Sequence, residues 1–178
     1  DRELQNSKLF SNQSGFAVYF KTARQFKLPK TEVRFKINNQ HLLDSSLYTY
    51  AKLDAAILNE MIKENLYDAL LFSHIKVSTS NEGYLLKVES FSNKANEILK
   101  SLLQMFSNSE SASENTFDNI KQRFVQALKD FKVGQPLTKA SSFLENMIYK
   151  DSPLAAEILT KMEAITFKDY KEKISSIR

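Results

Sequence analysis

The chain has 178 residues, of which 42% are hydrophobic and 26% charged, with a formal net charge of +4. This length suits a single domain, residues 1–178, that can bury an apolar core. The 25 basic residues are scattered among 21 acidic ones, which disfavours a nucleic-acid-binding surface, and no apolar run is long enough for a membrane span. The absence of cysteine excludes disulfides and thiol chemistry within the chain.

The N-terminus has neither an initiating Met nor the basic-then-apolar layout of a signal peptide. We therefore expect the chain to start either inside a longer polypeptide or after a removed tag, and we interpret it as a fragment of a larger multidomain chain.

Four short segments predict β-strands. An apolar run at residues 16–20 follows Gly15, and residues 31–37 alternate apolar with charged side chains, as in a strand with one buried face. Residues 75–79 and 84–88 alternate in the same way. The polar segment Ser80–Gly83 lies between them, which predicts a β-hairpin with a four-residue loop.

One long helix is expected between the second strand and the hairpin. Apolar residues recur there at three- and four-residue steps, which predicts a helix of about 25 residues that starts at Asp44 or Ser45 and ends near Leu70. A helix of this length is expected to lie across the sheet as the central element.

The remainder of the chain predicts helices only. Asn93 and Thr116 are candidate N-caps, and Pro136 suits the first turn of a third helix. Ser152–Pro153 starts a fourth. Thr166 begins the last helix, with an acidic residue three positions on, as in a capping box.

These elements together predict an α+β fold. A mostly antiparallel sheet of about four strands, in the order β-β-α-β-β, is covered by the long helix and followed by a run of helices. Residues 107–115 are rich in Ser, Asn and Glu, and we expect them to form a mobile surface loop.

The two histidines predict no metal site, because neither has a second histidine one helical turn away. His41 is interpreted as a surface-loop residue. His74 lies where the helix meets the hairpin, and it is expected to hydrogen-bond a helix carbonyl. No catalytic, metal-binding or cofactor-binding residue is therefore assigned.

Three other groups of residues have competing interpretations. Glu60 and Glu64 are one turn apart, but they are expected to lie on a solvated face near Lys63 or Lys52. Tyr67–Asp68 is interpreted as a packing residue beside a cap. The third group consists of Lys129, Lys132 and Lys139. The positive charges of Lys129 and Lys132 suit the C-terminal end of a helix. A contact with a peptide is the alternative interpretation for all three.

Several segments, taken in order, resemble the middle domain of the insulinase–pitrilysin family of zinc metallopeptidases. The family's long helix reads L-N-E followed by E-Y-A-Y-D-A-E-L-A-G-L, its hairpin exit G-Y-N-D-K, and a later helix end L-x-N-F-x-x-x-Q-P. The matching segments here are Ala17–Lys21, Phe26–Lys30, Leu58–Glu60, Glu64, Tyr67–Ala69, Phe91–Lys94, Leu128–Phe131 and Gln135–Pro136. The chain departs from the family pattern at Leu70 and at Phe72-Ser73-His74.

The resemblance implies a non-catalytic domain in the chamber wall that encloses peptides opposite the zinc domain. Zinc would be held by the H-x-x-E-H motif of another domain, and no cofactor is expected in this chain. Neighbouring domains of the same polypeptide and the peptide substrate would be the partners, and a cytoplasmic location is expected.

Two other hypotheses about function remain open. The parent could be a catalytically degenerate relative that binds peptides or subunits, or the chain could be an unrelated α+β interaction module. If the domain is part of a larger polypeptide, an apolar patch is expected where the C-terminal domain docks.

Overall fold

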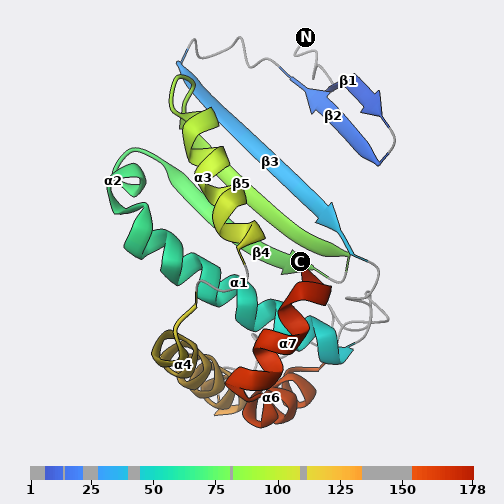
Figure 1. The fold of residues 1–178 in the computed structure, drawn as a ribbon, viewed down its shortest axis with the longest axis vertical. Coiled ribbons are helices and arrows are strands. Elements are labelled where there is room, and N and C mark those ends of the chain that lie inside the picture. Colours follow the sequence, from blue (N-terminus) through green and yellow to red (C-terminus); the bar gives the residue numbers. More distant parts are fainter. Residues whose placement is uncertain are drawn as a thin grey trace.

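Two antiparallel sheets and six helices make up the described part of the chain, which is residues 7–13, 15–21, 28–39, 45–80, 82–108, 112–133 and 154–178 of a computed structural model (Figure 1). The strands are β1 (Lys8–Gln13), β2 (Phe16–Phe20), β3 (Lys30–Asn38), β4 (His74–Ser80) and β5 (Gly83–Phe91). The helices are α1 (Ser45–Asn65), α2 (Tyr67–Leu70), α3 (Ala95–Ser107), α4 (Glu114–Val133), α6 (Ala155–Ala164) and α7 (Phe167–Ile177). The predicted α+β fold class is confirmed.

The larger sheet has the order β3-β5-β4, with both neighbours antiparallel to β5. Burial alternates along β3 as the sequence predicted, because apolar side chains face the helices and charged ones face away. β4 ends at Ser80 and β5 begins at Gly83, so two residues lie between the strands instead of the predicted four. Gly83 itself pairs with both Asn38 and Ser80, which extends the ladder into the expected loop.

The smaller sheet is a separate hairpin of β1 and β2, not part of one four-stranded sheet. It stands apart from the larger sheet, beyond the β3 edge (Figure 1). β1 was not predicted from the sequence, because its residues, KLFSNQ, show neither regular alternation nor β-branched side chains. A ring contact of 6.1 Å between the centroids of Phe16 and Phe35 joins the hairpin to β3.

The long helix is confirmed as the central element, but it is broken. α1 ends at Asn65, Leu66 leaves the helical conformation with φ −120° and ψ 29°, and α2 adds one further turn. The apolar pattern continues through the break, because Leu66, Ala69 and Leu70 all pack against the core. Periodicity alone therefore could not locate it.

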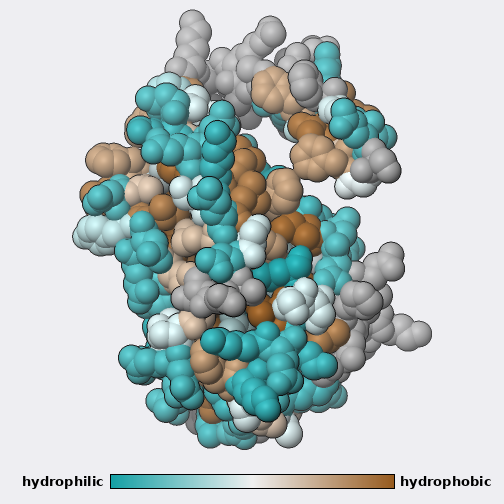
Figure 2. All heavy atoms as spheres, in the orientation of Figure 1, coloured by the Kyte–Doolittle hydropathy of each residue, from teal (hydrophilic) through white to brown (hydrophobic). Residues whose placement is uncertain are grey.

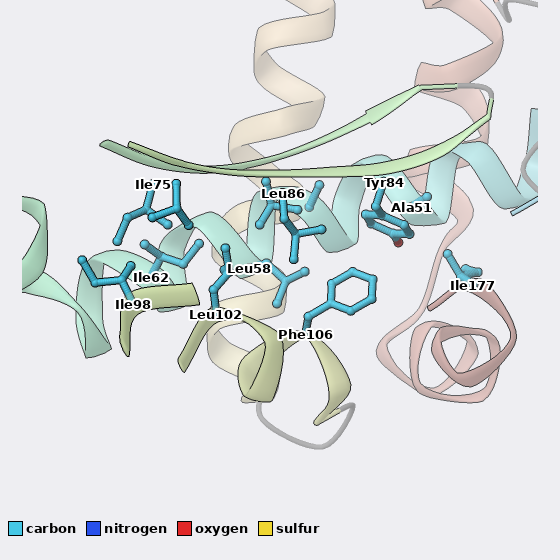
Figure 3. Close-up of a cluster of buried hydrophobic side chains, with 13 residues drawn as sticks. Ala51, Leu58, Ile62, Ile75, Tyr84, Leu86, Ile98, Leu102, Phe106 and Ile177 are labelled. Atoms are coloured by element: carbon cyan, nitrogen blue, oxygen red, sulfur yellow. The ribbon is translucent and has the colours of Figure 1, made fainter. Parts of the chain in front are cut away.

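α1 separates two buried clusters. One side of the helix packs on the sheet and α3 through Ala51, Leu58 and Ile62, and Figure 3 shows these side chains meeting those of the strands. The other side packs on α4, α6 and α7 through Leu53, Ile57 and Met61. The helix is buried on both sides, which accounts for its unusually continuous apolar sequence.

A side chain of α1 pairs with the outer edge of β4 at one residue, Val77. The Asn59 amide donates to Val77 O at 2.7 Å and accepts from Val77 N at 3.0 Å, as a neighbouring strand would. Open strand edges invite pairing with other chains, so this contact protects the sheet. It also gives a physical role to the central residue of the family-like Leu58-Asn59-Glu60 segment.

Helix starts agree with the sequence predictions only in part. The capping box at Thr166 and Asp169 is confirmed, and hydrogen bonds from Thr166 hold the pKa of Asp169 below its ordinary value. The predicted caps Asn93 and Thr116 are wrong, because Lys94 occupies the N-cap of α3, whereas Thr116 lies inside α4 and donates its N–H to the Ser113 hydroxyl at 3.1 Å. The expected helix start at Pro136, and Ser152–Pro153, lie outside the described residues.

Residues 107–115 are only partly a connection. α3 includes Ser107, α4 begins at Glu114, and Ala112 between them is buried. The expected mobility of this segment stays a prediction.

Candidate functional site

Of the two histidines, only His74 lies in the described part of the chain. His74 is the first residue of β4, is exposed, and lies opposite Glu89 in the sheet register. Its expected bond to a helix carbonyl is not among the contacts of the described residues, and His41 lies outside them. Within the described ranges, no three His, Asp or Glu residues are grouped so that they could hold a metal ion.

The two carboxylates of α1 that are one turn apart, Glu60 and Glu64, lie in different surroundings. Glu60 accepts a hydrogen bond from Lys63 at 2.9 Å and lies 3.6 Å from the Arg123 guanidinium of α4. The Lys63 hydrogen bond, opposed by partial burial, lowers the pKa of Glu60, and the charges of both cations add to this. Lys52 instead lies over the Tyr48 ring at 5.0 Å. The predicted Lys63 pairing is thus confirmed for Glu60, whereas Glu64 lies one turn further, at the rim of a groove.

The lysines near the family-like helix end have an ordinary structural contact where they are described. Lys129 pairs with Glu163 of α6 at 2.8 Å, with both side chains about half exposed. The Lys132 side chain, Lys139 and the Gln135–Pro136 segment lie outside the described residues.

One face of the larger sheet is covered by no helix in the described part of the chain. α1 and α3 both lie on the opposite face, toward which the core side chains point (Figure 3). In register, the uncovered face carries a row of three cations: Arg34, Lys87 and Lys76. Beside this row are Leu85, half-buried and apolar, and the acidic residues Glu32 and Glu89. The face is broad, strongly polar and of mixed charge.

A groove with a volume of about 890 Å³ lies at the far end of α1. One wall is the corner from α1 through α2, and the other is the corner from the end of β5 to the start of α3. Apolar side chains gather on the surface around α2, at the left of Figure 2. The aromatic residues that line the groove are Tyr67, Phe72 and Phe91, and the ionisable ones are Glu64, Asp68, Lys94 and Glu97.

The family-like pair Tyr67–Asp68 belongs to this groove. Tyr67 is 66% exposed, so its interpretation as a packing residue is wrong. The reason is the break at Leu66, which turns α2 away from the line of α1 and places Tyr67 on the outside. Two of the three residues that depart from the family pattern in the next segment, Phe72 and Ser73, line the same groove.

A buried ion pair joins α1 to Arg178, the C-cap residue of α7. Asp54 of α1 is fully buried and lies 2.7 Å from the Arg178 guanidinium, whose side chain is 7% exposed. The hydroxyl groups of Tyr84 and Tyr170 also donate to the Asp54 carboxylate, at 3.0 and 2.7 Å. The guanidinium in turn donates to carbonyls at the end of α3, including Phe106 O at 2.8 Å.

The network is satisfied electrostatically as well as geometrically. Burial raises the pKa of Tyr84 and of Tyr170, and the nearby Asp54 charge raises both further, so both phenols stay protonated and donate. Burial opposes the charge on Arg178, but the hydrogen bonds and charge of Asp54 outweigh it and raise the pKa of Arg178. This arrangement ties four elements together, so we assign it to stability and not to catalysis.

Sequence reasoning missed this network, although one signal for it was present. Asp54 interrupts an otherwise apolar stretch, Leu53-Asp54-Ala55-Ala56-Ile57, at a position that faces the core. An acidic residue in such a place demands a buried partner. Its partner is 124 residues further along the chain, so the sequence could not identify it.

Comparison with known proteins places the chain in a family. Residues 2–161 match the family described as the middle or third domain of peptidase M16. The chain is 29% identical over 153 residues to insulin-degrading enzyme of Drosophila melanogaster and 28% identical over 153 residues to A-factor-processing enzyme of Saccharomyces cerevisiae. These matches cover 84% and 85% of this chain, but only 15% and 14% of the relatives.

The fold has a counterpart among solved structures. The crystal structure of pitrilysin superposes with a TM-score of 0.81 at 15% identity, over 96% of this chain and 18% of that one. This likeness concerns the fold alone. Because the family match extends over most of the sequence, the chain belongs to the family of middle, or third, domains of peptidase M16.

Proposed function

We propose that this chain is the non-catalytic middle domain of an insulinase-like zinc metalloendopeptidase, where it forms part of the wall of a chamber that encloses peptides opposite the zinc domain. The match of residues 2–161 to the middle-domain family carries the proposal. The small share of the relatives that the chain covers supports a role as one part of a larger machine. The cytoplasmic location expected from the sequence is part of this proposal.

The uncovered face of the larger sheet is the surface that would face the peptide. Continuous antiparallel pairing of β3, β5 and β4 makes this face a single surface. Its mixed charges and the apolar Leu85 offer a peptide both ionic and apolar contacts. The opposite face cannot serve, because α1 and α3 cover it.

Zinc would be held by another domain of the polypeptide, where it would activate water for attack on the peptide carbonyl. The described residues of this chain do not fit such a site, since they bring no three carboxylate or imidazole ligands together. Its own contribution would be to enclose and orient the peptide, which raises the effective concentration of the scissile bond at the zinc domain.

A second function is favoured by the groove at α2. The chain departs from the family pattern at Phe72-Ser73-His74, and Phe72 stands 68% exposed beside that groove. A departure from the family pattern at an exposed groove is what we would expect in a catalytically degenerate relative that acts as a peptide- or subunit-binding scaffold. Peptide hydrolysis by the longer polypeptide would exclude this alternative.

The chamber-wall proposal predicts a difference in access between two faces of the domain. This chain has no cysteine, so in a cysteine-free version of the longer polypeptide Leu85→Cys places one thiol on the uncovered sheet face. Lys168→Cys places one on α7 as the matched control, since the Lys168 side chain is 86% exposed. We expect a small maleimide to label both thiols, and a polymer-linked maleimide to label Leu85→Cys at least about tenfold more slowly than the control, because the chamber excludes the polymer.

A bound, slowly cleaved peptide should slow the labelling of Leu85→Cys by the small maleimide as well. Equal rates at both positions with the polymer-linked reagent would contradict a wall role for this face.

A further inference from the structure

The groove at α2 has the shape of a socket with a polar floor. The Ser73 and Ser90 hydroxyls are hydrogen-bonded to each other at 2.7 Å, and Ser90 is only 2% exposed. The floor is therefore fixed, and the groove is bounded by elements that pack in the core. An occupant would meet a preformed surface and would not need to reorder it.

The walls of the groove expose aromatic side chains to solvent. Tyr67 and Phe72 are 66% and 68% exposed, and Phe91 is 39% exposed on the facing wall. Contiguous apolar surface of this kind marks an interaction site, because covering it gains about 25 cal/mol for each Å² removed from water. The sequence had led us to expect such a patch where a neighbouring domain docks.

The charge of the groove selects the chemistry of the occupant. Three carboxylates line it against one ammonium group, and that ammonium, on Lys94, already pairs with Glu97 at 2.9 Å. Glu64 and Asp68 have no ionic or hydrogen-bonding partner among the described residues. The C-terminal end of α1 adds its negative dipole end beside them, while Glu97 in the first turn of α3 offsets the positive end of that helix.

Unpaired carboxylates beside exposed aromatic faces form a site for an organic cation. A guanidinium or ammonium group gains both ion pairing and attraction to the ring faces. An apolar residue next to the cation would cover the remaining aromatic surface. A segment that carries Lys or Arg flanked by apolar side chains fits these requirements.

We propose that this groove docks such a basic segment from another part of the same polypeptide. The proposal rests on the proposed function, in which the chain is one domain of a longer protein. More than four-fifths of the length of the matched relatives lies outside the region that the chain covers, so that protein has ample sequence to supply the segment. A segment on the same polypeptide is also present at a high effective concentration, which suits permanent cover of an aromatic surface.

The test is a photo-crosslink in the longer polypeptide without substrate. Benzoylphenylalanine in place of Ser101, which lines the groove, should crosslink within one polypeptide to a segment outside these 178 residues that contains Lys or Arg, as identified by mass spectrometry. The double variant Glu64→Lys, Asp68→Lys should reduce the yield at least about tenfold, because it replaces attraction with repulsion. The matched double variant Glu157→Lys, Glu172→Lys reverses two acidic residues of α6 and α7 outside the groove and should leave the yield unchanged.

Several results would overturn the proposal. It would be overturned by a crosslink to a second copy of the polypeptide or by a crosslink to a segment without basic residues. The absence of any crosslink in the protein with Glu64 and Asp68 intact would also overturn it. The experiment uses no substrate and no activity, so its failure is separate from that of the chamber-wall proposal, which the thiol access of Leu85→Cys decides.

Discussion

Replacing Arg178 with Met is expected to lower the free energy of unfolding by roughly 3–5 kcal/mol, as is typical when one partner of a buried ion pair is removed. The Asp54 carboxylate would stay fully buried without its cationic partner, and the hydrogen bonds from the hydroxyls of Tyr84 and Tyr170 would remain to stabilise its charge. The carbonyls at the end of α3 would also lose their donor. Urea denaturation followed by circular dichroism measures the loss.

A second variant separates the ion pair from the simple loss of a side chain. Asp54→Leu combined with Arg178→Met should recover much of the stability, because no unpaired charge is then buried. The exposed pair of Lys129 and Glu163 provides the control, and Lys129→Met should cost less than about 1 kcal/mol. If Arg178→Met cost no more than this control, the network would not hold the fold together.

Gly83→Ala should be the second severe substitution. Gly83 has a φ of +146°, and a Cβ atom at this position would lie 1.8 Å from the Ile37 carbonyl oxygen. The backbone conformation alone costs a non-glycine residue about 1–3 kcal/mol, and the collision with a backbone atom of β3 cannot be relieved by a side-chain movement. We expect β3 to separate from β5 at this end of the sheet.

Gly15→Ala is the matched comparison for this prediction. Gly15 also has a positive φ, of +80°, but nothing lies within 4 Å of an added Cβ. It should therefore cost only the backbone strain, about 1–2 kcal/mol. Thermal unfolding of the two variants, together with amide exchange along residues 30–38, measures the difference, and equal losses would show that the contact with Ile37 is unimportant.

The parts of the fold that could be predicted from the sequence are those set by neighbouring residues. Alternation in residues 31–37 indicated the buried face of β3, and Thr166 with Asp169 indicated the capping box of α7. In each of these patterns, the residues that interact are only a few positions apart in the sequence. The long apolar face of α1 likewise identified the helix that packs against β4, α3, α4, α6 and α7.

The parts that the sequence did not reveal depend on distant contacts or on single backbone angles. The pairing of Asp54 with Arg178 joins residues 124 positions apart, and the break at Leu66 keeps the apolar period intact. The break at Leu66 also shapes the groove, because it places Tyr67 on the outside of the helix, across from the corner between β5 and α3. Tyr67 and Asp68 match the family pattern and line the groove, but the sequence predicted no groove at that position.

Under the proposed function, this domain would support peptide hydrolysis without performing it. The most direct measurement compares bound zinc and peptide cleavage for the 178-residue chain and for the longer polypeptide that carries it, each with and without a chelator. We predict stoichiometric zinc and chelator-sensitive cleavage in the longer polypeptide, and neither in the chain alone. Robust chelator-sensitive cleavage by the chain alone would contradict the account.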